Sequence, residues 1–231
     1  MVTTKPIFQL RGIGVDYQTP AGVVPGVEDI SIDVPARGMT VLAGPSGSGK
    51  STLLRVLGLF EQPARGSLTF QGADVRKLRH RDRRALRRDH LGLVFQNPAD
   101  NLLSYLTVAE NLRAAAEAAG TECRPEEILE QLGLHGTGGW KIAALSGGQQ
   151  QRLAFGCVLA ARSTVILADE PTSQLDEASA DLVLDTLQFL VDQDFAVLVA
   201  SHDERLIDLG ARVARLHKGR LECVEERGED R

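Results

Sequence analysis

Cysteine and aromatic residues are scarce in this sequence, and positive charge is not in excess. Its 231 residues include three cysteines, Cys123, Cys157 and Cys223, which lie far apart and form no CxxC pair. An odd number at such spacing argues against a disulfide framework and against a cysteine zinc site, and is typical of reduced thiols. Aromatic residues make up 4% and the formal net charge is −5. Neither value indicates a nucleic-acid binder.

Long apolar runs are also missing. No run approaches the ~18 residues that a membrane-spanning helix needs. Residues 1–12 lack the basic-then-apolar order of a signal peptide. If the protein works at a membrane, we therefore expect another chain to supply the spanning helices. The length suits one large α/β domain, or one domain that carries an insertion.

The pattern of apolar residues predicts an α/β fold. Residues 7–34 alternate apolar and polar side chains between Gly and Pro turns, as short antiparallel strands do. Apolar residues recur at helical spacing over 50–60, and a second helical stretch covers 178–191. Short apolar runs predict buried strands at 39–43, 67–70, 91–95, 164–168 and 196–200. Strands that alternate with helices imply a parallel sheet.

Residues 97–161 are predicted to be mainly helical. Thr107 is a candidate N-cap, with Glu110 completing a capping box. Pro125 suits the first turn of a second helix, which we expect to run to about Leu132. A third helix is predicted to begin after Gly148. The charged residues after Glu225 are predicted to form a frayed tail.

An arginine-rich stretch covers residues 76–88. One interpretation is a basic helix that touches lipid headgroups or a partner. The other, which we take as the default, is a solvated, charged helix face. No aromatic residues interleave with the arginines, so the stretch does not resemble a nucleic-acid platform.

Residues 44–51, Gly-Pro-Ser-Gly-Ser-Gly-Lys-Ser, match the phosphate-binding pattern GxxxxGK[ST] and lie between a predicted strand and a predicted helix. Glycines let the backbone N–H groups wrap around phosphate oxygens, and the helix start adds a positive dipole end. We expect Lys50 to contact the β- and γ-phosphates, Ser51 to ligate Mg²⁺ and Thr52 to add a hydrogen bond.

A second acidic site follows the predicted strand at 164–168. Asp169 and Glu170 come where a strand of an α/β sheet delivers side chains into a ligand crevice. Alone, such a pair is usually a helix N-cap region. Together with the phosphate loop, it predicts Asp169 as an Mg²⁺ ligand and Glu170 as the general base for the attacking water.

Residues 145–149, Leu-Ser-Gly-Gly-Gln, precede a helical stretch over 150–161. A lone Ser-Gly-Gly is usually an ordinary capped helix start, but it is also an anion site at a helix N-terminus. Because one chain has a single phosphate loop, we expect Ser146 to Gly148 of one subunit to close on the γ-phosphate held by another.

The run LSGGQQQR resembles the signature of the ABC ATPase family, and the resemblance covers almost the whole chain. It implies that Gln96 is the glutamine that touches Mg²⁺ and couples to a membrane partner. It also implies that His202 contacts the γ-phosphate, that residues 173–176 cross a dimer interface, and that Tyr17 stacks on adenine. Taken singly, each of these residues is more often structural; their joint order and spacing carries the resemblance.

The resemblance implies a P-loop NTPase (RecA-like) core with an N-terminal antiparallel β-subdomain and an inserted α-helical subdomain. We expect residues 1–96 and 162–231 to form the ATP-binding core, and residues 97–161 to form the helical subdomain. The expected catalytic residues are Glu170 and His202, and the expected metal ligands are Ser51, Gln96 and Asp169. The expected nucleotide-binding residues are Tyr17, Gly44, Pro45, Ser46, Gly47, Ser48, Gly49, Lys50, Ser51, Thr52, Gln96, Ser146, Gly147, Gly148, Gln149 and Asp176.

The implied activity is ATP hydrolysis, with ATP and Mg²⁺ as cofactors. The implied partners are a transmembrane permease and a second ATP-binding subunit, as homodimer or heterodimer, at the cytoplasmic face of the cell membrane. The segments GLVFQ, LTVAEN and ADEPT resemble the lipoprotein-release and macrolide-export branch, and cell-division and amino-acid-uptake ATPases are similar. Regulation of a membrane partner without solute transport, and a soluble ATPase of repair or translation, remain alternatives.

Five positions depart from the family's pattern. Cys157 stands in place of an arginine, Ser163 in place of a proline, and Gln174 in place of a small residue. Residues 141–142, Lys-Ile, replace a frequent Tyr-Pro. None of these departures lies in the predicted phosphate chemistry, so they bear on the partner, substrate and branch instead.

Overall fold

The computed structural model describes residues 5–20 and 22–227. Over these residues the strands form a four-stranded sheet, in the order β2-β1-β4-β5, and a six-stranded sheet, in the order β10-β9-β3-β8-β7-β6. The bounds of the strands are β1 Phe8–Thr19, β2 Gly22–Val34, β3 Gly38–Ala43, β4 Arg65–Phe70, β5 Ala73–Asp74, β6 Leu91–Val94, β7 Val165–Asp169, β8 Ala196–Ser201, β9 Arg212–His217 and β10 Arg220–Glu226.

Seven α-helices and three short 3₁₀-helices connect the strands of the described chain. Their bounds are α1 Lys50–Leu57, η1 Val75–Lys77, α2 His80–His90, η2 Pro98–Asp100, α3 Val108–Ala119, α4 Pro125–Gln131, η3 Ile142–Ala144, α5 Gly147–Ala160, α6 Glu177–Asp192 and α7 Glu204–Leu209. None of these helices has the length and apolarity to cross a bilayer.

The six-stranded sheet positions the candidate site. Its strands β6, β7, β8, β3 and β9 pair in parallel, and β10 is an antiparallel edge strand. All six residues of β8, Ala196–Ser201, are buried, as expected for a parallel strand covered on both faces. The carboxyl ends of β3, β7 and β8 therefore meet at one edge of the sheet, where α/β proteins bind ligands.

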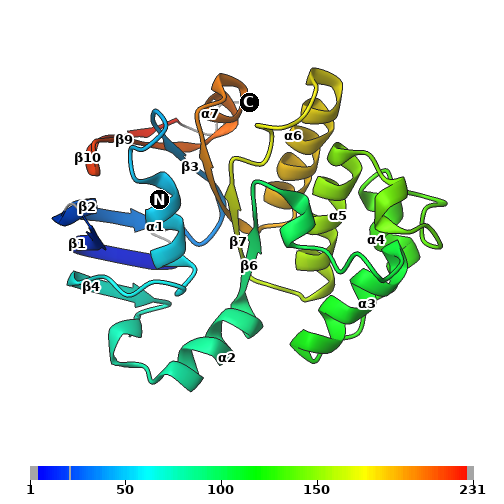
Figure 1. Ribbon diagram of the computed structural model, residues 1–231, viewed down its shortest axis with the longest axis horizontal. Helices are drawn as coiled ribbons and strands as arrows, with labels where there is room; N and C mark the ends of the chain where they lie inside the picture. Colours follow the sequence, from blue (N-terminus) through cyan, green and yellow to red (C-terminus); the bar gives the residue numbers. More distant parts are fainter. Residues whose placement is uncertain (1–4, 21, 228–231) are drawn as a thin grey trace.

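Two hydrophobic clusters cover the two faces of this sheet. On one side, α1 packs between the two sheets (Figure 1), and the cluster includes Phe8 and Leu10 of β1 with Leu53 and Leu57 of α1. On the other side, α5, α6 and α7 cover the strands, with Phe155 of α5 fully buried. The phosphate loop is thus fixed between a buried strand and a buried helix.

A third cluster contains no residue of either sheet. It joins α3, α4 and α5, lies entirely within residues 102–160, and includes Leu112, Leu129 and Leu153. Figure 1 shows these helices side by side at the end of the molecule away from the four-stranded sheet. This group therefore has its own core, while α5 also packs against α6.

The predicted fold class is confirmed: a P-loop α/β core, an antiparallel sheet from the N-terminal part and a group of helices. The capping box at Thr107 and Glu110 is confirmed, and Pro125 is the first residue of α4. α1 ends at Leu57 rather than Phe60, because Leu59 has a φ of 57°. α5 begins at Gly147, two residues before the predicted start, since the Ser146 side chain caps it.

The C-terminal part departs further from prediction. The hairpin of β9 and β10 and the short helix α7 were not foreseen, and β10 runs to Glu226 where a frayed tail was predicted. Arg212 of β9 pairs with Glu226 of β10 at 2.9 Å, so a charged residue of the predicted tail contributes a cross-strand pair. The rest of the predicted tail, 228–231, lies outside the described residues.

Candidate active site

The predicted phosphate loop follows β3 and leads into α1. Gly44, Gly47 and Gly49 have φ angles of 152°, 76° and 100°, which side-chain-bearing residues rarely adopt. A Cβ on Gly44 would lie 2.2 Å from the carbonyl oxygen of Leu216, and one on Gly49 would lie 2.7 Å from that of Gly26. The loop therefore needs glycine at both positions, for backbone conformation and for space.

Lys50, the first residue of α1, is held inside this loop. Its Nζ donates to the carbonyl oxygens of Gly44 and Pro45 at 2.7 and 3.2 Å. The same Nζ lies 3.3 Å from Oε1 of Glu170, and the Lys50 side chain is only 5% exposed. The ammonium is thus positioned and desolvated, which strengthens its attraction for phosphate oxygens.

Glu170 lies at the first position after β7, and three groups hold its carboxylate. Besides Lys50, Oε2 lies 2.9 Å from Nδ1 of His202 and accepts a hydrogen bond from Oγ of Ser201 at 3.4 Å. Its φ is +46°, a conformation that costs a non-glycine residue on the order of 1–2 kcal/mol. Its N–H is bonded to the carbonyl of Ala200 at 2.8 Å, so the neighbouring strand β8 maintains this turn.

Asp169 and Ser51 form a second polar pair beside it. The Ser51 hydroxyl donates to Oδ1 of Asp169 at 3.0 Å. Burial, with the nearby charge of Glu170, raises the pKa of Asp169 above its usual range, although the Ser51 hydrogen bond opposes the shift. A hydroxyl next to a carboxylate is a donor set that suits Mg²⁺, which prefers oxygen ligands and retains several waters or phosphate oxygens. The residues present therefore fit the predicted metal.

A buried serine in the loop supports the same conclusion. The Ser48 side chain is 2% exposed, and its Oγ has no hydrogen-bond partner within the described parts of the chain. Buried polar atoms without partners are rare and call for an explanation. A loop shaped to surround phosphate oxygens provides one.

Tyr17, near the end of β1, is tied to α1 and to the loop that follows it. Its hydroxyl donates to Oε2 of Glu61 at 2.8 Å and lies 3.2 Å from Oγ1 of Thr52. Burial raises the pKa of Tyr17. Sequence reasoning missed Glu61, because nothing in the residue pattern links a loop after α1 to β1. These contacts join the predicted adenine-stacking residue to α1, the helix that follows the phosphate loop.

Gln96, which follows β6 after one residue, is bonded to the loop that follows Glu170. Its Nε2 donates to Oγ of Ser173 at 3.1 Å, and Ser173 Oγ donates to the carbonyl oxygen of Glu170 at 3.0 Å. From the other side, Gln151 of α5 donates to the carbonyl of Phe95 at 3.3 Å and is 1% exposed. The sequence did not single out Gln151, and it placed Ser173 only in the expected interface segment 173–176, without a contact to Gln96.

The signature residues lie on other elements. Ser146 caps α5: its Oγ accepts from the N–H of Gln149 at 3.3 Å, and the Gln149 side chain accepts from the Ser146 N–H at 2.9 Å. Asp176 caps α6 by accepting from the N–H and hydroxyl of Ser179, both at 2.9 Å. A Cβ on Gly148 would lie 2.7 Å from Cβ of Ser179, so α5 and α6 meet closely at their starts.

A cleft of about 340 Å³ collects the predicted catalytic groups. Its lining residues are Pro25, Gly26, Ser46, Gly47, Gly49, Lys50, Ser51, Thr52, Gln96, Glu170 and His202. Ser146–Gln149 and Asp176, in contrast, are not among them, although they too belong to the described chain. A larger groove of about 610 Å³ between α4 and the end of α5 contains none of these groups. Within one chain, the structure thus brings together the phosphate loop, both acids and His202, without the signature.

Three comparisons with known proteins all find ATP-binding proteins of ABC transporters. The profile of the family described as ABC transporter matches residues 27–173. The lipoprotein-releasing system ATP-binding protein LolD of Novosphingobium aromaticivorans is 40% identical over 228 residues, which covers 95% of this chain and all of that protein. The macrolide export ATP-binding/permease protein MacB 1/2 of Paracoccus denitrificans is 37% identical over 95% of this chain, which spans only 33% of that longer protein.

A solved structure shares the fold. It is the dimeric structure of a post-hydrolysis state of the ATP-binding cassette MJ0796 bound to ADP and Pi, with a TM-score of 0.85 and 28% identity. The similarity covers 96% of this chain and 99% of that one.

Proposed function

Because the chain belongs to the ABC transporter family, as one of its ATP-hydrolysing cassettes, we propose that it powers a membrane transporter of the lipoprotein-release or macrolide-export kind through ATP-dependent dimerisation. The observation that carries the proposal is the contact of Glu170 with Lys50 and His202, beside the Ser51–Asp169 pair. These are the groups that phosphoryl transfer to water needs. Lys50, Ser51, Glu170 and His202 line one cleft, and Asp169 is bonded to it through the Ser51 hydroxyl.

We assign the roles of the residues as follows. The loop of residues 44–51 and Lys50 bind the phosphates, and Tyr17 stacks on the adenine. Ser51 and Asp169, with Gln96, would hold Mg²⁺, which neutralises the charge that develops on the phosphate oxygens. Glu170 orients and deprotonates the attacking water, and His202 contacts the γ-phosphate.

The signature residues lie outside the nucleotide cleft of their own chain, which supports a nucleotide site shared between two chains. Ser146 to Gln149 present a helix N-terminus, an anion-binding arrangement, yet they do not line the cleft of their own chain. The related cassette MJ0796 is a dimer in its ADP- and phosphate-bound structure. We propose that ATP joins two copies, or this chain and a paralogue, and that hydrolysis removes the shared contact.

Replacing Ser146 with arginine tests the shared site. We expect Ser146→Arg to leave ATP binding by the monomer within twofold of the parent, because the cleft lies elsewhere. The ATP-dependent dimer should be lost, since a bulky cation would occupy the place of the γ-phosphate contact. Sedimentation with ATP measures the dimer, and Gln188→Arg, at an exposed position of α6, is the matched control. A dimer of normal stability in Ser146→Arg would contradict the assignment.

The contact between Glu61 and Tyr17 allows a second test, which concerns only the binding of the adenine ring. Without the carboxylate, Tyr17 loses a hydrogen bond that fixes its ring. We expect Glu61→Leu to weaken ATP binding roughly fivefold, since stacking of a base on an aromatic ring is worth about 1–3 kcal/mol. Binding of inorganic tripolyphosphate, which has no base, should not change. Glu61→Gln retains an acceptor and should restore most of the affinity, whereas equal losses for both ligands would indicate a structural role only.

The membrane partner is proposed from the relatives. LolD belongs by its name to a lipoprotein-releasing system, and MacB joins an ATP-binding part to a permease. We propose that this chain binds a transmembrane permease at the cytoplasmic face of the membrane, with residues 97–161 as a helical subdomain inserted between residues 1–96 and 162–231. Reconstitution of the chain with its permease in vesicles tests this, by ATP-dependent solute or lipid movement. ATP hydrolysis without such movement would favour a regulatory ATPase.

A further inference from the structure

The arginine-rich stretch forms a basic surface on η1 and α2. Residues 76–90 contain eight Lys or Arg and two Asp, a net charge of +6 in a chain of −5, so that all other residues together carry −11. We define the basic surface by its six exposed cationic residues: Arg76, Lys77, Arg79, Arg81, Arg84 and Arg88. This asymmetry is far from the even mixture of charges on an ordinary solvated surface.

Acidic residues compensate only part of this charge. Lys77, Arg81 and Arg88 pair with Asp74, Asp82 and Asp89 at 3.4, 3.6 and 2.7 Å. Among the described residues, no carboxylate lies within 4 Å of the cationic groups of four other arginines, namely Arg79, Arg83, Arg84 and Arg87.

The neighbouring arginines also affect one another. Burial lowers the pKa of Arg87, and the charges of Arg83 and Arg84 add to that effect. Like charges one turn apart on a helix destabilise it. An anionic ligand would relieve this repulsion.

The helix is fixed on the protein with its basic side outward. Leu78 and Leu86 pack against the main core. The Arg87 guanidinium donates to the carbonyl of Leu59 at 2.7 Å and lies 4.9 Å from the ring centroid of Phe60. The Phe60 side chain is itself 55% exposed. The half-buried Arg87 thus fixes the helix against the body of the protein, while the six residues of the basic surface remain exposed.

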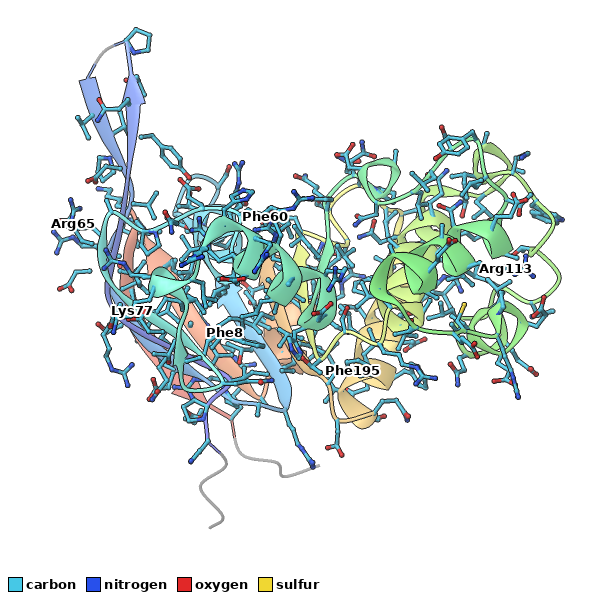
Figure 2. All side chains as sticks on the ribbon, turned by 90° about the horizontal axis from the view of Figure 1, so that it is seen from below. Phe8, Phe60, Arg65, Lys77, Arg113 and Phe195 are labelled. Carbon is cyan, nitrogen blue, oxygen red and sulfur yellow. The ribbon has the colours of Figure 1, made fainter. Side chains whose placement is uncertain are left out.

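The basic surface lies away from the nucleotide cleft. α2 ends where β6 begins, whereas the cleft lies at the carboxyl ends of the parallel strands. β6 has four residues, so about 13 Å of strand separates the end of α2 from the Gln96 segment. Figure 1 shows α2 along the lower edge of the molecule, and Figure 2 views the molecule from that side. A ligand at this surface would leave the cleft open.

We propose that the basic surface binds the anionic headgroups of a lipid bilayer, so that the cassette contacts the membrane directly as well as through a permease. Arginine binds phosphate groups with two parallel hydrogen bonds. The six residues are spread over two consecutive helices, η1 and α2, and the segment between them, and the Arg76 guanidinium also donates to the carbonyl of Gly66. Such a spread fits an extended array of phosphates better than a single small anion.

Vesicle binding by the full chain, without nucleotide or permease, tests this proposal. The protein is sedimented with vesicles of phosphatidylcholine, or of phosphatidylcholine with about a third phosphatidylglycerol. We expect binding only to the anionic vesicles. Each exposed arginine should contribute about 1 kcal/mol, or roughly fivefold in the partition coefficient. Because salt screens these charges, binding should fall steeply as the salt concentration rises. Lys50→Ala should bind the same vesicles normally, which separates this proposal from the nucleotide assignments.

Matched variants locate the surface. Replacing Arg79, Arg81, Arg84 and Arg88 together with glutamine should lower the partition coefficient more than a hundredfold. The control replaces four other exposed arginines that have acidic partners: Arg37, Arg113, Arg124 and Arg220. It changes the net charge equally, and we expect less than a tenth of the effect.

Two results would overturn the proposal. One is the absence of binding to anionic vesicles at 100 mM salt. The other is an equal loss in both fourfold variants. If the first variant does not fold, Arg84→Gln and Arg88→Gln made singly should each lower binding about fivefold, and unchanged binding in both would overturn the proposal as well.

Discussion

Replacing Glu170 with glutamine should reduce ATP turnover by about a hundredfold to ten-thousandfold, the typical contribution of a positioned general base. The amide has nearly the same shape and can still accept from Ser201, so the turn at this residue should persist. Because the phosphate loop is untouched, ATP binding should remain, and the ATP-bound dimer should accumulate. Phosphate release measures turnover, and sedimentation with ATP measures the dimer.

A suitable control is Glu130→Gln, at an exposed position of α4 far from the cleft, which should retain the parent's rate. Hydrolysis by Glu170→Gln at the parent's rate would show that another group activates the water. Loss of ATP binding would show instead that the carboxylate serves to bind nucleotide.

Replacing Lys50 with alanine should weaken ATP binding by about tenfold to a hundredfold. The Nζ is almost fully buried and points into the loop, and hydrogen bonds to a charged group contribute about 1.5–3 kcal/mol. Turnover should fall with affinity, because fewer sites are filled and the γ-phosphate loses a counter-charge. Equilibrium binding of a fluorescent ATP analogue measures the affinity.

The control for this change is Lys141→Ala, which removes an exposed lysine that donates to the carbonyl of Tyr105. Its ATP affinity should match the parent's. The melting temperature of Lys50→Ala should also be compared, because the substitution leaves the Glu170 carboxylate buried with only His202 and Ser201 as partners. An unchanged affinity in a folded Lys50→Ala protein would contradict the role of the loop.

Much of this fold follows from local rules in the sequence. The Gly-rich loop between β3 and α1 and the capping box at Thr107 rest on contacts within a few residues, so short patterns identify them. The strand β8 is apolar over nearly its whole length, which is enough to place it inside a parallel sheet. The position of Glu170 also follows from a local pattern, because a residue directly after a buried parallel strand lies at the carboxyl edge of the sheet, where ligands bind.

The features that could not be predicted from the sequence are contacts between segments far apart in the chain. Glu61 meets Tyr17 across 44 residues, and Gln151 meets the carbonyl of Phe95 across 56. Neither pairing leaves a local pattern, because a single glutamate or glutamine looks the same whether it bonds to water or to a distant backbone. The hairpin of β9 and β10 was missed for a related reason: its cross-strand ion pairs consist of residues typical of a disordered tail.

The Arg-rich stretch was visible in the sequence, but its role could not be predicted from it. Its composition was plain in the sequence, but composition alone favoured an ordinary solvated helix. The packing of Leu78 and Leu86 against the core, and the arginines without carboxylate partners, are seen only in the three-dimensional arrangement. Burial and pairing, which a sequence does not display, are what separate a binding surface from a solvated one.

The ion pair between Lys50 and Glu170 also determines the charge balance of the cleft. With the ammonium and the carboxylate 3.3 Å apart and both largely buried, the resting cleft is close to electrically neutral. A triphosphate that enters brings several negative charges, and Lys50 alone cannot neutralise them while it still faces Glu170. The incoming nucleotide must therefore arrive with counter-ions of its own, so tight binding by this cleft should require a divalent cation rather than merely be improved by one.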